Sequence, residues 1–123
     1  MKRAIFTFYN LSLDTDIVRL QAEVVKKFNT TADFHPLCSK THGEEVIHPD
    51  AVDYGFNQLF VEEKYDTVLL LDVDCIPLNA YALEYTFEQA EKGKLIGNVQ
   101  RGMHLDNDEH NYVAPSAFCL SRQ

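Results

Sequence analysis

Asp72 and Asp74 are the two residues of this sequence whose type and spacing are best suited to chemistry. They directly follow an aliphatic run, Val68-Leu69-Leu70-Leu71, and a proline three residues after Asp74 ends the segment. A short unbroken apolar run predicts a strand covered on both faces, as in a parallel sheet. Side chains two apart on an extended chain point to the same side, so both carboxylates leave the strand together, where open α/β sheets hold their ligands.

Two convergent carboxylates form a hard oxygen site that suits Mg²⁺ or Mn²⁺, and such an ion is usually shared with substrate phosphates. The alternative is a pair of solvated loop aspartates or a helix cap, since Asp is common at strand ends. The long apolar run that precedes Asp72 and Asp74 favours the metal site.

The composition predicts one soluble, cytoplasmic domain over residues 1–123. The net charge of −8, from 19 acidic and 11 basic residues, argues against a nucleic-acid partner because no basic stripe is present to neutralise phosphates. It also disfavours an anionic substrate unless a cation mediates. No apolar run approaches the length of a membrane span, and three unpaired cysteines predict reduced thiols.

The elements that must position the aspartates alternate between strand and helix. The pattern predicts a strand over residues 3–9, a helix after Asp14, and an edge strand over residues 32–38 that contains Pro36. The predicted buried face of the first helix consists of Ile17, Leu20, Val24, Val25 and Phe28.

The second half of the chain continues the alternation. A helix is predicted from His48 to near Lys64, in which Gly55 indicates close backbone packing. A third helix, residues 80–92, is predicted to begin at the cap Asn79 and to stop at Gly93. Strands over 94–99 and 112–120 complete an α/β fold, with a mostly parallel sheet of about five strands and helices on both faces.

At Asp72-Val73-Asp74 the chain resembles the nucleotide-binding half of a GT-A-type glycosyltransferase, with its Rossmann-like domain and its DXD motif after an apolar strand. Ala51-Val52-Asp53-Tyr54-Gly55 is similar to the A-x-N-x-G stretch on the preceding helix, with Asp53 in place of Asn. Thr7-Phe8-Tyr9-Asn10 lies where the first strand of that family ends, and Ala114-Pro115-Ser116-Ala117-Phe118-Cys119-Leu120 resembles the strand before the acceptor half.

The resemblance implies a nucleotide-sugar donor, UDP-sugar above all, bound through Mn²⁺ or Mg²⁺. Asp74 would be the direct metal ligand, and Asp72 would bind the metal through water or hold the ribose. The metal neutralises charge that develops on the leaving nucleoside diphosphate. The residues that would contact the nucleotide are Thr7, Phe8, Tyr9, Asn10, Asp53 and Asp72.

The same resemblance implies that the acceptor half is missing, because inverting members of the family carry their general base beyond the point where this chain stops. The remaining acidic candidates for a catalytic role are Asp106, Asp108 and Glu109. We therefore expect either a truncated enzyme or a chain that meets an unknown acceptor on a partner protein or on a second copy of itself.

Three functions stay open on the sequence. The first is glycosyl transfer, or hydrolysis of the donor with water as acceptor. The second is a non-catalytic nucleotide-sugar-binding module or partner subunit. The third is a haloacid-dehalogenase-type phosphatase, because Asp72-Val73-Asp74-Cys75-Ile76 after an apolar strand resembles its nucleophile motif, although that family normally opens with the motif.

Overall fold

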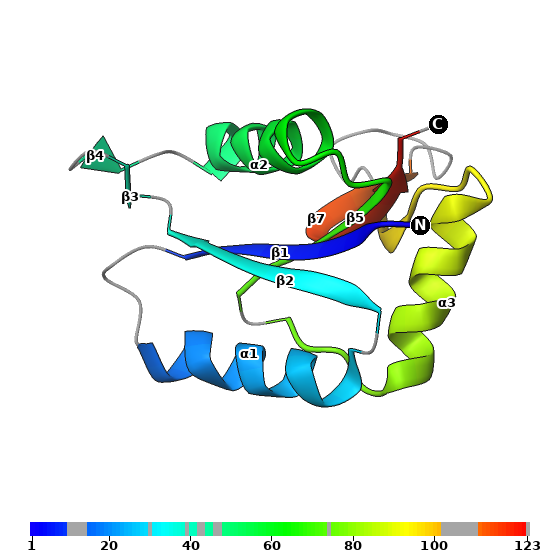
Figure 1. Ribbon diagram of the computed structural model, residues 1–123, viewed down its shortest axis with the longest axis horizontal. Helices are drawn as coiled ribbons and strands as arrows, with labels where there is room; N and C mark the ends of the chain where they lie inside the picture. Colours follow the sequence, from blue (N-terminus) through cyan, green and yellow to red (C-terminus); the bar gives the residue numbers. More distant parts are fainter. Residues whose placement is uncertain are drawn as a thin grey trace.

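A five-stranded sheet with strand order β2-β1-β5-β7-β6 forms the centre of the protein in the computed structural model (Figure 1). The structure describes residues 1–9, 15–29, 31–38, 40–41, 44–45, 48–73, 75–101 and 111–122. Its elements are β1 (Arg3–Tyr9), α1 (Thr15–Phe28), β2 (Ala32–Cys38), β3 (Lys40–Thr41), β4 (Glu44–Glu45), α2 (His48–Asn57), the π-helical turn η1 (Gln58–Glu62), β5 (Thr67–Leu71), α3 (Ala80–Glu91), β6 (Ile96–Arg101) and β7 (Asn111–Ser121).

The sheet is mixed, which corrects the predicted mostly parallel arrangement. β1 pairs in parallel with both β2 and β5, but β7 runs antiparallel to both of its neighbours, β5 and β6. A parallel return needs a crossover of a dozen or more residues, usually a helix. Only nine residues separate β6 from β7, so β7 comes back in the opposite direction.

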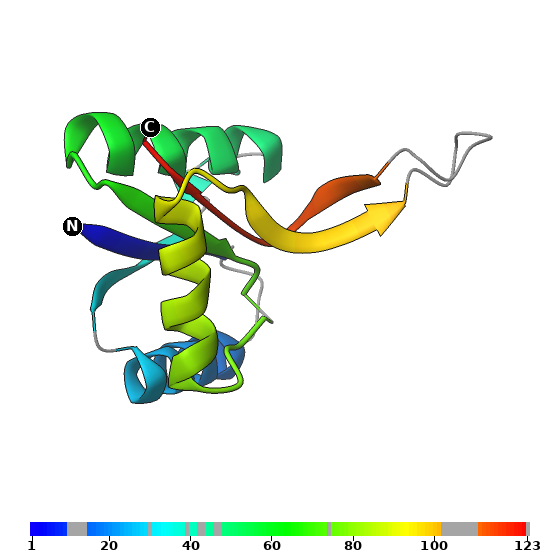
Figure 2. The same ribbon diagram turned by 90° about the vertical axis from the view of Figure 1, so that its right-hand side faces the viewer.

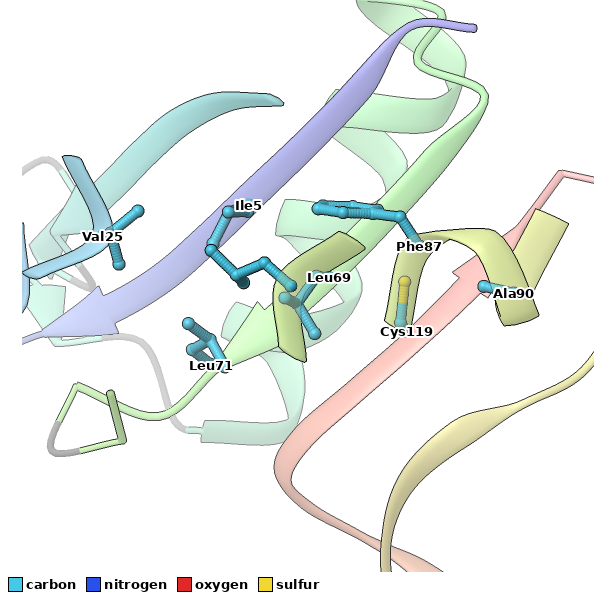
Figure 3. Close-up of a cluster of buried hydrophobic side chains, with 8 residues drawn as sticks. Ile5, Val25, Leu69, Leu71, Phe87, Ala90 and Cys119 are labelled. Carbon is cyan, nitrogen blue, oxygen red and sulfur yellow. The ribbon is translucent and has the colours of Figure 1, made fainter. Parts of the chain in front are cut away.

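Helices cover both faces of the sheet, as predicted (Figure 1). On one face, α1 and α3 pack on β1, β5 and β7 around Ile5, Val25, Leu69 and Phe87, and Figure 3 shows these side chains converging. Cys119 is fully buried in the same cluster, and burial raises the pKa of its thiol to about 12. On the other face, α2 and η1 form a second cluster with β1 and β5.

The central strand β5 is the best-buried element of the sheet. All five of its residues are buried, because it has a strand on each side and a hydrophobic cluster on each face. This confirms the prediction from the aliphatic run. β2 lies at the sheet edge, also as predicted, where the missing N–H of Pro36 is tolerated.

The predicted buried face of α1 is wrong at two positions. Ile17 and Leu20 are 39% and 56% exposed, whereas Gln21 and Val25 are buried. The helix is turned so that a polar residue, Gln21, faces the interior. The prediction placed apolar residues on the buried face because it used hydrophobic periodicity alone. Periodicity considers only apolar positions, so it cannot predict that a glutamine is buried.

The other two helices follow the prediction closely. Asn79 caps α3, since its side-chain oxygen accepts a hydrogen bond from Ala82 N at 2.8 Å. Gly93, with φ of 86°, ends that helix in the left-handed conformation that glycine adopts readily. η1 extends α2 until the chain turns at Lys64, whose φ is 61°. The π-helical geometry of η1 was not predicted.

The strands β6 and β7 form an antiparallel ribbon that extends away from the rest of the domain (Figure 2). Its register shifts between Gly97 and Val99, and such an irregularity bends and twists a ribbon. Among the helices that the structure describes, none is long and apolar enough to span a membrane.

Candidate metal and nucleotide site

The candidate site lies at the carboxyl ends of β1 and β5. These two strands pair in parallel, with Phe6 opposite Leu70, so both chains leave the sheet at the same edge. Asp72 follows β5 directly, and Tyr9 is the last residue of β1. The fold therefore places at one sheet edge the two strand ends, near residues 9 and 72, that the resemblance assigns to one ligand.

A tight turn begins at Asp72. The backbone N–H of Cys75 donates to the carbonyl oxygen of Asp72 at 2.8 Å, which closes a four-residue turn. The Asp72 side chain is half-buried. Asp74, the second predicted metal ligand, lies in this turn by sequence but outside the described residues.

The turn is also held from α1. The side-chain amide nitrogen of Gln21 donates to the carbonyl oxygen of Asp72 at 2.7 Å and to that of Cys75 at 2.8 Å. Gln21 is only 1% exposed. The prediction from the sequence did not identify Gln21. The one signal for it was that a polar residue stands four positions before Val25 on a helix face that is otherwise apolar.

The predicted nucleotide contacts at the end of β1 differ in burial. Thr7 is fully buried, and among the described residues its hydroxyl has no hydrogen-bond partner. Phe8 is half-buried and packs edge-to-face on Phe6, with ring centroids 5.4 Å apart. Tyr9 is half-buried at the strand end. In this conformation Tyr9 is thus better placed than Thr7 to offer side-chain surface to a base.

Asp53 lies on the exposed side of α2, two residues before Gly55. Gly55 anchors α2 to β1, because a Cβ placed there would lie 2.5 Å from Cε2 of Phe6 and 2.9 Å from Cζ of Phe8. This contact confirms that close packing requires the glycine. It also fixes the helix that carries Asp53 against the strand that carries Tyr9.

Several predicted site residues lie outside the described part of the chain. These are Asn10, Asp74, Asp106, Asp108 and Glu109. Among the described residues, no group of three or more His, Cys, Asp or Glu side chains is arranged to hold a metal. A pair of carboxylates remains compatible with Mn²⁺ or Mg²⁺, which commonly take further ligands from phosphate and water.

A cavity of about 300 Å³ adjoins the turn on the α3 face of the sheet. Cys75, Ile76 and Pro77 form one wall, and Leu83 and Thr86 of α3 form another. None of its described lining residues is charged. Such a lining is poorly matched to a diphosphate.

No protein-family model matches this chain, and no curated protein is significantly similar to it in sequence. The functional assignment therefore depends on the residues and geometry described above.

Proposed function

We propose that this chain binds a nucleoside diphosphate sugar, with UDP-sugar as the first candidate, through Mn²⁺ or Mg²⁺ held by Asp72 and Asp74. The observation that carries the proposal is the position of the Asp72–Cys75 turn. It directly follows the buried central strand and lies beside the end of β1. Ligands of open α/β sheets bind at this edge.

The charge of the protein supports a metal-mediated site. With a net charge of −8, the chain repels a diphosphate, and a divalent cation between the carboxylates and the phosphates removes that repulsion. A cation that neutralises the diphosphate also makes it a better leaving group when the glycosidic bond breaks. We propose that the glycosyl group is transferred to an acceptor or to water, and that the protein is a glycosyltransferase or a donor hydrolase.

Binding is tested by thermal unfolding with UDP in the presence of Mn²⁺, Mg²⁺ or EDTA. We expect UDP to raise the melting temperature only with a divalent metal, because the ion would bridge the carboxylates and the diphosphate. At 100 times its Kd, a ligand stabilises the folded protein by about 2.7 kcal/mol, which is enough to measure. Asp74→Ala should abolish this shift. Glu88→Gln is the matched control, because it removes one exposed negative charge on α3, away from the turn.

Three outcomes would contradict the proposal: no shift with any metal, an equal shift in EDTA, or a shift that survives in Asp74→Ala. Catalysis is tested separately by product analysis with UDP- and GDP-sugars. Free or transferred sugar above a metal-only blank, lost in Asp74→Ala, distinguishes an enzyme from a binding module. Hydrolysis of an aryl phosphate that Asp72→Asn abolishes would instead indicate the phosphatase.

A further inference from the structure

Gln21 is a buried polar residue in the interior face of α1. Its neighbours on that face pack in the hydrophobic cluster around Val25 and Ile5, where a Leu or Met side chain of similar length would fit the apolar surroundings. Burying an amide is unfavourable unless its hydrogen bonds are satisfied. The hydrogen bonds of Gln21 must therefore compensate for the cost of burying its amide.

Those contacts are confined to the nitrogen of the amide. Nε2 uses both of its hydrogens, one toward the carbonyl oxygen of Asp72 and one toward that of Cys75. Oε1 is buried and has no partner among the described residues. The orientation of the amide is fixed by chemistry, because the flipped amide would place Oε1 against two carbonyl oxygens.

The two accepting carbonyls belong to the first and last residues of the turn. The Asp72 oxygen accepts from both Gln21 and the Cys75 N–H, so both of its lone pairs are used. α1 thus holds both the start and the end of the turn through one side chain. The two residues between those ends are Val73 and Asp74.

We propose that Gln21 is a positioning residue that fixes the Asp72–Cys75 turn in the geometry needed for metal binding. Gln21 touches neither metal nor substrate in this role; it acts through the turn backbone. The effect on metal affinity rests on the proposed function, whereas the effect on the turn does not. The two parts are therefore tested by different measurements.

The first measurement is hydrogen exchange of the Cys75 amide, which needs no ligand. Gln21→Met keeps the length and packing of the side chain and removes both donors. Val25→Ala, one helical turn away in the same buried face, is the matched control that lowers stability without touching the turn. We expect Gln21→Met to speed exchange at Cys75 at least tenfold relative to the Leu69 amide, and Val25→Ala to change both amides alike.

The second measurement is the Mn²⁺ dissociation constant. It is determined by electron paramagnetic resonance at a temperature where all variants are folded. We expect it to rise about tenfold or more in Gln21→Met and to stay within about twofold of the wild type in Val25→Ala. Gln21→Glu should also weaken Mn²⁺ binding, since a protonated carboxyl offers only one hydrogen to the two carbonyls and an ionised one offers none.

The outcomes separate the two proposals. If Gln21→Met and Val25→Ala change Cys75 exchange alike, Gln21 only fills space and the positioning role is overturned. If Cys75 exchange responds but the wild type does not bind Mn²⁺, the hold on the turn stands, and both the metal-binding part of the role and the proposed function fail. If Mn²⁺ binds equally well to wild type and Gln21→Met, the link from turn to metal is overturned.

Discussion

Gly55 of α2 lies so close to Phe6 of β1 that a single added methyl carbon would come within 2.5 Å of the phenylalanine ring. Phe6 is fully buried and also packs edge-to-face on Phe56, with centroids 5.0 Å apart. Its ring therefore has little room to move aside. The contact sets how near α2 can approach the strand that leads to the candidate site.

We expect Gly55→Ala to destabilise the fold by about 1–3 kcal/mol through overpacking. Phe6→Leu shrinks the obstructing ring, so the double variant should lose less than the sum of the single losses. Denaturant unfolding of the four proteins measures this coupling. Tyr54→Ala, at an exposed neighbouring position on α2, is the control; additive losses of Gly55→Ala and Phe6→Leu would contradict the steric explanation.

Glu84 provides a pH-dependent contribution to stability. A hydrogen bond from Thr31 and the guanidinium of Arg3, 3.0 Å away, lower the pKa of this carboxyl. A lowered folded-state pKa gives stability that is present above the ordinary value of 4.5 and is lost as pH falls through the folded value. Glu84→Gln should therefore lower the melting temperature at pH 7.

The difference between wild type and Glu84→Gln should shrink as pH is lowered below about 4.5, because the unfolded wild type takes up a proton first and the folded carboxyl is neutralised only at lower pH. Calorimetry across pH 3–7 measures it, with Glu88→Gln as an exposed control on the same helix. A difference that keeps its full size at pH 3 would show that lost packing, and not charge, is responsible.

Tyr65 should make the protein sensitive to alkali. Its side chain is 3% exposed, and its hydroxyl donates to Asp33 at 2.7 Å and lies 2.9 Å from His35 Nε2. Burial, followed by the hydrogen bond to Asp33, raises the pKa of Tyr65 well above 10. The unfolded chain ionises first, so this group causes stability to fall as pH rises above about 10.

Tyr65→Phe removes that ionisation. We expect it to be less stable than the wild type at pH 8, because Asp33 and His35 lose a hydrogen-bond partner. The difference in unfolding free energy between wild type and Tyr65→Phe should narrow above pH 10, because only the wild type loses stability through ionisation of Tyr65. Urea unfolding at pH 8, 10 and 11 measures this difference. A stability difference that stays constant would mean that Tyr65 ionises equally easily in both states, and one that widens would mean that it ionises more easily in the folded state.

Metal and nucleotide should bind cooperatively at the proposed site. The ion would contact both the carboxylates and the diphosphate, so each ligand should tighten binding of the other by the same factor, about tenfold or more. Titration calorimetry of Mn²⁺ with and without UDP, and of UDP with and without Mn²⁺, measures the two factors. An Mn²⁺ affinity that is the same with and without UDP would contradict an ion shared between the carboxylates and the diphosphate.

Most of the scaffold could be predicted from local signals. The aliphatic run of β5, the cap at Asn79, the stop at Gly93 and the tight packing at Gly55 each depend on nearby residues or on one backbone requirement. The direction of β7 was also within reach, because the short connection after β6 carries no crossover helix. The prediction overlooked this length constraint in favour of the general α/β pattern.

The support of the candidate site could not be predicted in the same way. Gln21 and Asp72 are remote in sequence, and the bond between them uses a backbone carbonyl that every residue type carries. Nothing in the identity of Asp72 or Cys75 marks them as acceptors for a glutamine. The rotation of α1 that buries Gln21 and exposes Leu20 becomes visible only when the helix is docked on the sheet.

The position of β5 between β1 and β7 has a consequence for synthesis on the ribosome. β1 precedes β5 in the sequence and β7 follows it, so the central strand can pair with only one of its two neighbours until residues 111–121 have been made. Until then its β7 edge presents unpaired backbone groups and apolar side chains, a template for association with other nascent chains. Pairing of β7 with β5 covers this edge, so we expect the domain to be protected against association through the central strand only once β7 is in place.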